Sequence, residues 1–263
     1  MKASRRRLEE LSWSLGMARA ADSLYSFVKP RDKRLRASLV EFFRGLVPEG
    51  VLAFDIGTNV GTYASALEAL GARVVAVDAN ADSLRHIELM YPGRRIERIH
   101  AAVGNKSGLV SFKICDSDDG RSAIASRWLE AINEHYGRAA HQWNRQVTVP
   151  MITLDDLVAH FGKPYYIKID IEGYDGLALD GLSVQPPLVS FEFHRICLAD
   201  AMSSLDKPVF SVQSLFNVAT TPTEFLLAEW VGKEEVKRII AGSSGLDTWG
   251  DVFVKAPERS VAG

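Results

Sequence analysis

Cysteine is scarce in this sequence, and long apolar runs are absent. The 263 residues include only two cysteines, Cys115 and Cys197, too few for a disulfide framework or a cysteine-based metal site. We interpret them as reduced thiols. No apolar run approaches the roughly 20 residues of a membrane-spanning helix, so no membrane span is expected. Three arginines near the start are followed by glutamates rather than by an apolar segment, which argues against a signal peptide and favours a cytoplasmic protein.

A large excess of charge is also missing, since the formal net charge is −2. The distribution is nevertheless uneven. Residues 1–36 hold ten bases and four acids, a net charge of +6, which leaves −8 for the remainder. A basic arm of this kind could contact nucleic acid, but it is more often the solvated face of a helix. The acidic remainder argues against a broad nucleic-acid interface, so nucleic acid is not an expected partner.

The G-x-G-x-x-G loop of dinucleotide-binding proteins is the third absence. A buried strand does lead into a glycine loop, but Asp55 ends that strand and the loop then supplies Gly57, Thr58, Asn59 and Gly61. An acid at this edge of a sheet repels a pyrophosphate and favours a cation or a hydroxyl donor. Asp78 ends the next strand, where an acid can accept both hydroxyl protons of a ribose. These residues favour an adenosine cofactor with a positively charged tail, S-adenosylmethionine.

Strands and helices alternate along the chain, which predicts an α/β fold, a doubly wound parallel sheet with helices on both faces. Residues 1–48 are predicted to form a helical cap, with helices at 5–28 and 35–47. Residues 49–263 are predicted to form the main methyltransferase domain, with an insertion at 116–145. Buried strands are predicted at 51–55, 73–78, 96–103, 165–170 and 187–194. A strand and then a helix are predicted within 225–240, and a closing strand at 248–254. Alternating apolar residues at 110–114 and 147–151 indicate antiparallel or edge strands. Thr153 and Asp156 have the spacing of a helix-capping pair.

Residues 116–145 interrupt this alternation. A polar loop comes first, and a stripe of apolar residues with helical spacing follows, which includes Trp128. We interpret the segment as an insertion above the sheet edge. It could be a substrate lid, because mobile segments often close over active sites, or an ordinary surface helix.

A second group of polar residues ends the later strands. Lys168, Asp170 and Glu172 recur at a spacing of two, and Glu192 and His194 repeat this spacing on the next strand. Residues spaced in this way share one face of a strand. Methyl transfer to a hydroxyl needs close positioning and a group that takes the proton.

The proton acceptor has two candidates. His194 has an unperturbed pKa near neutrality, and Glu172 is the alternative, although a histidine at a strand end is as often structural. A divalent ion could also be bound by the polar groups of this edge, namely Asp170, Glu172, Glu192 and His194. Acids at a sheet edge are more often hydrogen-bonded to the backbone or a substrate, so no metal is predicted.

Taken together, these motifs resemble those of the FkbM-family methyltransferases, within the class I S-adenosylmethionine-dependent group. The resemblance covers roughly residues 50–195, with a weaker echo at 249–253, and it rests on the following segments: Phe54–Gly61, Val77–Asp78, Ala102–Gly104, Thr153–Asp156 and Ile167–Gly173. The run T-L-D-D followed by K-I-D-I-E-G is its most specific part. The family usually has an acid two residues after the second run, where this chain has Tyr174-Asp175.

The resemblance implies a seven-stranded Rossmann-like sheet whose last strand is antiparallel. It also implies cofactor contacts at Asp55, Gly57, Asn59, Gly61 and Asp78, with Asp170 and Glu172 near the transferred methyl. Further cofactor-binding candidates lie in the matching motifs: Thr58, Ala102 and Val103. Family members are O-methyltransferases that act on hydroxyls of sugars or secondary metabolites, so a small molecule or glycan is the expected substrate. The substrate itself is not transferable, because the cap, the insertion and residues 196–245 lie outside the match. A homodimer through the N-terminal helices is a further expectation.

Three other functions remain as alternatives. A nicotinamide oxidoreductase is opposed by the missing G-x-G-x-x-G loop. A nucleic-acid methyltransferase that flips its target base would have an Asn/Asp-Pro-Pro-aromatic motif at the fourth strand. This chain has residues 170–173, Asp-Ile-Glu-Gly, at that place, which opposes this function. A cofactor-binding scaffold without catalysis is opposed by the acids at the strand ends.

Overall fold

The computed structural model describes residues 30–115, 126–136, 145–242 and 249–257, together with Ser122, Ile124 and Trp143. Its main sheet has seven strands: β1 Leu52–Ile56, β2 Arg73–Asp78, β3 Ile96–His100, β7 Tyr166–Ile169, β8 Leu188–His194, β9 Leu215–Ala219 and β10 Trp249–Lys255. A smaller sheet has three: β4 Ala102–Val103, β5 Gly108–Ile114 and β6 Arg145–Ile152. The described helices are α3 Pro30–Arg44, α4 Thr62–Ala69, α5 Ala81–Met90, α6 Ser126–Tyr136, α7 Leu154–Phe161, α8 Asp175–Asp180, α9 Leu198–Leu205 and α10 Lys233–Gly242, with the 3₁₀ turn η2 Arg195–Cys197 between β8 and α9.

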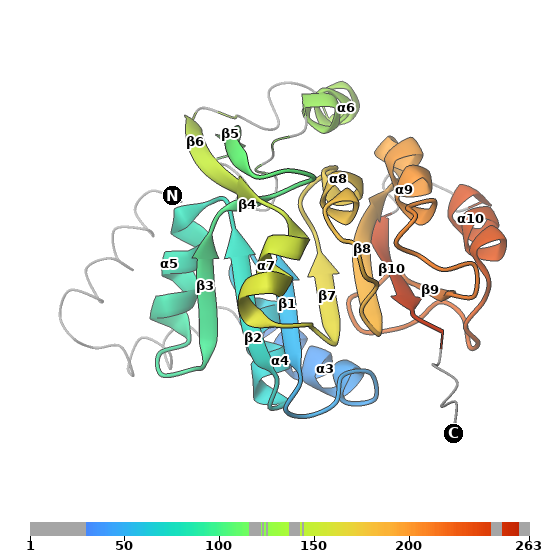
Figure 1. Cartoon of the computed structure of the whole chain (residues 1–263), viewed down its shortest axis with the longest axis horizontal. Coiled ribbons are helices and arrows are strands. Elements are labelled where there is room, and N and C mark those ends of the chain that lie inside the picture. Colours follow the sequence, from blue (N-terminus) through green and yellow to red (C-terminus); the bar gives the residue numbers. More distant parts are fainter. Residues whose placement is uncertain are drawn as a thin grey trace.

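The main sheet has the order β3-β2-β1-β7-β8-β10-β9 (Figure 1). Neighbouring strands from β3 to β8 pair in parallel, whereas β10 runs antiparallel to both β8 and β9. The doubly wound α/β fold and the antiparallel last strand are therefore confirmed. None of the helices in the described ranges is long and apolar enough to cross a membrane.

Two apolar cores cover the two faces of this sheet, because successive residues of a strand point to opposite sides. Phe54 and Ile56 of β1 belong to one core, which α7, α8, α9 and α10 complete. Ala53, which precedes Phe54 in the same strand, belongs to the second core, together with residues of α3, α4 and α5. Both faces of the central strands are buried, which explains their nearly continuous apolar sequence.

The small sheet and α6 stand at the edge where the parallel strands end (Figure 1). β5 and β6 pair antiparallel, as predicted, and β4 joins β6 in parallel. At Thr153 the predicted capping pair is present, since Thr153 and Asp156 exchange side-chain and backbone hydrogen bonds at the start of α7.

Several predicted elements are wrong in position. The strand predicted at 96–103 is divided between the two sheets, because β3 ends at His100 beside β2, whereas Ala102 and Val103 pair with β6. No strand begins at Phe225, whose ring instead packs against Phe42, Trp230 and Phe253. β9 lies earlier, at 215–219, and α9 was not predicted.

The second cap helix runs over Pro30–Arg44 rather than 35–47. The predicted helix 5–28 and the polar loop at 116–120 lie outside the described residues, and the homodimer through the N-terminal helices stays a prediction.

Candidate functional site

A cavity of about 480 Å³ opens where β1, β2, β7 and β8 end. Its walls come from these strand ends, the small sheet, the insertion around α6 and the start of β10. The residues that line it are Ile56, Gly57, Asn59, Val77, Asp78, Ala79, Ala101, Ala102, Val103, Phe112, Ser122, Ile124, Trp128, Asp170, Ile171, Glu172, Glu192, His194 and Trp249. This edge is the usual ligand-binding position in open α/β sheets.

The loop after β1 can approach its neighbours only because of its glycine. Gly57 has a φ of +75°, and a Cβ there would lie 1.8 Å from the backbone oxygen of Asp170. Asn59 adopts a φ of +48° in the same loop, and Glu172 a φ of +54° across the cavity. A positive φ is costly for residues other than glycine and is found most often at functional sites. Both of these strained residues line the cavity.

The amides of this loop are already used within the protein. The N–H groups of Gly57 and Thr58 both donate to Val77 O, at 2.9 and 3.2 Å. The N–H of Asn59 donates to Asp78 Oδ2 at 2.8 Å. A phosphate-binding loop needs such amides free to face the ligand, so this loop is poorly suited to a pyrophosphate.

Asp55 lies beneath the loop rather than in the cavity wall. Its side chain is buried, and Oδ2 accepts hydrogen bonds from Thr58 Oγ1 at 2.7 Å and from the N–H of Ala64 at 3.0 Å. Burial raises the pKa of Asp55, and the positive charge of Lys168 partly offsets this effect. Asp55 therefore ties the loop to the first turn of α4.

Thr58 and Gly61 also lie outside the set of cavity-lining residues. Thr58 is buried with its hydroxyl on Asp55, and Gly61 precedes α4 with Ile87 packed against it. The cofactor-binding roles of Asp55, Thr58 and Gly61 stay predictions, and any contribution from Asp55 would be indirect.

Asp78 faces the cavity with both carboxylate oxygens held in place. Oδ2 accepts from Asn59 N, and Oδ1 accepts from Asn80 N at 2.7 Å. Burial raises its pKa to about 6, although these two backbone hydrogen bonds lower it. Each oxygen keeps a lone pair for a further donor. Ala102 and Val103 are buried nearby and give the cavity an apolar wall.

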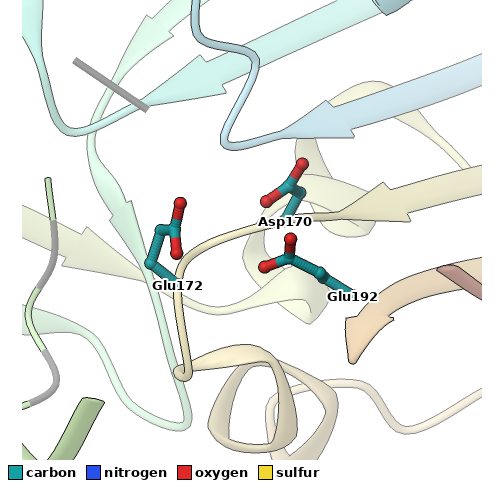
Figure 2. A group of neighbouring side chains, drawn as sticks. All are labelled: Asp170, Glu172 and Glu192. Atoms are coloured by element: carbon teal, nitrogen blue, oxygen red, sulfur yellow. The ribbon is translucent and has the colours of Figure 1, made fainter. Parts of the chain in front are cut away.

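Three carboxylates from β7 and β8 meet at the other side of the cavity (Figure 2). Oxygens of Asp170, Glu172 and Glu192 all lie within 4.8 Å of one another. The buried Lys168 forms an ion pair with Asp170, Nζ to Oδ2 at 2.8 Å. Burial and then the negative charges of Asp170 and Glu172 raise the pKa of Glu192 well above its usual range. The three groups are close enough to share one positive charge, either a proton or a cation.

His194 ends β8 and caps η2. Its Nδ1 accepts a hydrogen bond from the N–H of Ile196 at 3.4 Å. If the ring is neutral, the proton must then be on Nε2. His194 lines the cavity, and in this tautomer its remaining nitrogen is a hydrogen-bond donor.

The structure brings most of the predicted site residues to one cavity, and it adds others. The predicted residues that line it are Gly57, Asn59, Asp78, Ala102, Val103, Asp170, Glu172 and His194. Trp128 and Trp249 were not predicted as site residues, and Glu192 was considered only as one of the groups that could bind a divalent ion. The spacing of two between Glu192 and His194 was a usable signal for Glu192, whereas no local pattern distinguishes Trp128 from its apolar neighbours.

The charges of the cavity wall are all of one sign. The described lining residues include four carboxylates, those of Asp78, Asp170, Glu172 and Glu192, and neither lysine nor arginine. This wall favours a ligand that carries hydroxyl groups and positive charge, and it disfavours a polyphosphate.

The chain matches the family model described as Methyltransferase FkbM domain over residues 55–202. Among solved structures, magnesium protoporphyrin IX methyltransferase from Synechocystis PCC 6803, with bound S-adenosylmethionine, is similar at 11% identity and a TM-score of 0.44, covering 86% of this chain and 79% of that one.

Two other solved structures are similarly distant. A TehB-like S-adenosylmethionine-dependent methyltransferase from Corynebacterium glutamicum ATCC 13032 Kitasato is 12% identical with a TM-score of 0.42, covering 90% of this chain and 98% of that one. Precorrin-6y C5,15-methyltransferase from Geobacter metallireducens GS-15 is 11% identical with a TM-score of 0.38, covering 84% and 87%. No curated protein matches the chain.

Proposed function

Because this chain belongs to the FkbM family of S-adenosylmethionine-dependent methyltransferases, we propose that it methylates a hydroxyl group of a small molecule, such as a sugar, a glycan or a secondary metabolite. The observation that carries the proposal is the cavity wall, which gathers carboxylates from three strand ends and includes neither lysine nor arginine among its described residues. Carboxylates accept hydrogen bonds from hydroxyl groups and attract a positively charged donor.

The residues present fit the cofactor. Asp78 has a lone pair left on each oxygen for the two ribose hydroxyls. Asn59 Oδ1 is buried without a partner among the described residues, and Asn59 lines the cavity, so it is free to accept a hydrogen bond from the ligand. The apolar wall at Ala102 and Val103 suits a flat base. When bound, S-adenosylmethionine would supply a methyl group activated by a positively charged sulfur.

The carboxylates at the ends of β7 and β8 would position the acceptor. Asp170 is paired with Lys168, and its carboxylate oxygens can accept a hydrogen bond from a hydroxyl. Glu172 and His194 lie on the same cavity wall and can orient the acceptor oxygen, Glu172 as a hydrogen-bond acceptor and His194 through its N–H. Holding the acceptor in line with the methyl group is the main requirement of this reaction. A carboxylate must also take the hydroxyl proton.

Binding experiments test the cofactor assignment. We expect isothermal titration calorimetry to show binding of S-adenosylmethionine and S-adenosylhomocysteine, and none of NAD, because the loop amides are occupied and the wall is acidic. Binding of NAD alone would favour the oxidoreductase. An absence of binding by either sulfur ligand would refute the proposal.

Acceptor screening tests the rest. A panel of sugars, hydroxylated metabolites and amines, incubated with radiolabelled methyl donor, should give labelled hydroxylated compounds. If the cofactor binds and an amine is labelled but no hydroxyl is, the proposed O-methylation is wrong and the protein is an N-methyltransferase. Variants of the strand-end acids then separate enzyme from scaffold, since Asp170→Asn should reduce transfer while cofactor binding persists.

A further inference from the structure

A small second cavity of about 20 Å³ adjoins the main one, and Trp128, Glu192 and His194 line both. Its wall also includes Gly173 and Asp175, which lie just before and at the first residue of α8. A cavity of roughly 10–15 Å³ or more can hold one water molecule if two to four polar groups surround it.

Two polar atoms of this small cavity have no hydrogen-bond partner among the described residues. Trp128 is 2% exposed with Nε1 unpartnered, and Asp175 is 5% exposed with Oδ1 unpartnered. An unpaired buried polar group costs about 1–3 kcal/mol, so native proteins rarely keep one. One of these atoms is a donor and the other an acceptor. A water molecule in this cavity would offer both atoms a partner.

Trp128 packs closely against Gly173. Its Cβ and its Cδ1, the ring carbon bonded to Nε1, both lie 2.8 Å from the position of a Cβ on Gly173. Gly173 lines the small cavity and is absent from the wall of the main one. Because a side chain at residue 173 would collide with the indole, the glycine allows this close approach.

Glu192 connects the two cavities, and its surroundings make it the natural proton acceptor. The charged groups that face it are Asp170 and Glu172 after β7, Asp175 of α8, and Asp251, which lies opposite it on β10. The nearby cation, Lys168, is already paired with Asp170. Burial and these negative neighbours raise the pKa of Glu192, and burial raises that of Asp175 to about 7.

We propose that Glu192 takes the proton of the acceptor hydroxyl, and that one water molecule in the small cavity passes this proton to Asp175. The inference rests on the proposed O-methylation. The O–H bond of the acceptor breaks and its proton goes to a Glu192 oxygen. The oxygen's electron pair forms the new bond to the methyl carbon, and the pair of the old carbon–sulfur bond stays on sulfur. Glu172 and His194 then act as positioning residues.

Infrared spectroscopy of the protein with S-adenosylhomocysteine tests the role of Glu192. We expect a band of protonated carboxyl groups that weakens as the pH rises. Glu192→Gln should remove one component of it, and Glu229→Gln, at an exposed position outside both cavities, should leave it unchanged. Glu192→Asp, which keeps the charge, serves if the glutamine variant does not fold. The full wild-type band in a folded Glu192→Gln variant would overturn the proposal.

A crystal structure at a resolution that shows buried water tests the second part of the proposal, the water molecule that passes the proton to Asp175. Water should lie within hydrogen-bonding distance of Trp128 Nε1 and Asp175 in the wild type. Trp128→Phe, which keeps an aromatic ring but removes the donor, should lose or displace it and shift the infrared titration of Asp175. Trp230→Phe, away from both cavities, should do neither. A dry cavity in the wild type would overturn the water relay. Neither readout needs turnover, so loss of cofactor binding would refute the proposed function separately.

Discussion

Asp78 shows how one side chain can serve both the fold and the ligand. Its two oxygens fix the loop after β1 and the start of α5 through the N–H groups of Asn59 and Asn80. Asp78 also lines the cavity. A substitution at this position should therefore remove the proposed ribose contact and also loosen the loop that shapes the site.

Asp78→Ala should weaken the binding of S-adenosylhomocysteine by about 1–3 kcal/mol, because ribose hydroxyls would lose a charged acceptor. The wild type should also lose affinity as the pH falls through about 6, the pKa of Asp78. The ionised form is the better acceptor, so protonation opposes binding, by up to about tenfold per pH unit. Calorimetry from slightly alkaline to mildly acidic pH measures both effects.

Asp82→Ala is the matched control for this experiment. Asp82 lies four residues further along, in the first turn of α5, and its side chain is not part of the cavity wall. This variant should keep the wild-type affinity and its pH dependence. The ribose assignment fails if Asp78→Ala binds as tightly as Asp82→Ala.

At the level of single residues, sequence reasoning named most of the polar residues that meet at one cavity, but not the direction of each side chain. Asp78 and Asp170 were predicted from their positions at strand ends, and both line the cavity. Asp55 has the same kind of position, yet its side chain turns inward to Thr58 and Ala64. A strand end fixes where a residue lies, but local hydrogen bonds decide where its side chain points.

The loop between β1 and α4 depends on the absence of a side chain at one position. Gly57→Ala should lower the free energy of unfolding by about 1–3 kcal/mol more than Gly50→Ala does. Both glycines have a similar φ, +75° and +78°, but a Cβ at Gly57 meets the backbone oxygen of Asp170, whereas a Cβ at Gly50 meets nothing within 4 Å. Urea unfolding of the two variants measures the difference. Equal costs would mean that the close approach to Asp170 is unimportant.

Among the elements, prediction succeeded where local pattern and burial agree. β2 was placed at its observed bounds, because its apolar run ends sharply in Asp78. The strand predicted at Phe225 was wrong, since this side chain packs in an aromatic cluster with Phe42 and Phe253 and does not belong to a strand. The division of residues 96–103 between two sheets depends on a tertiary partner, β6. No property of the segment alone indicates that partner.

At the scale of the whole fold, buried acids outnumber buried cations among the residues that the structure describes. Burial raises the pKa of Asp78 and Asp251 to about 6 and that of Asp175 to about 7. The folded state therefore binds more protons than the unfolded state between about pH 4 and 7. Stability from such groups is fully present below the unfolded pKa and is lost as the pH rises through the folded pKa. The ligand-free protein should unfold at a higher temperature at mildly acidic pH than at neutral pH.

Calorimetric melting across this range measures the effect, and Asp251→Asn should flatten the slope. Asp251 is 6% exposed, and its raised pKa corresponds to up to about 3 kcal/mol. Glu229→Gln, at the surface, should keep the wild-type slope. A stability that rises steadily toward neutral pH would contradict the prediction.

The carboxylates at the site should not require a divalent ion. Lys168 already places a positive charge beside Asp170, and a proton on one of the remaining acids relieves their repulsion. We expect that neither magnesium nor a chelator changes the melting temperature or the affinity for S-adenosylhomocysteine. A magnesium-dependent rise in the melting temperature of the wild type that Glu172→Gln abolishes would show that the acids bind a metal.

The position of β10 also has a consequence for synthesis on the ribosome. β9 precedes β10 along the chain, but in the sheet β10 separates it from β8. During translation, residues 215–219 emerge before the strand to which they pair, so the edge of β8 that pairs with β10 stays open until residues 249–255 have been made. Unpaired edges of this kind promote aggregation of nascent chains. Insertion of β10 must therefore follow the synthesis of both its neighbours, and chaperones that shield strand edges should matter most at that moment.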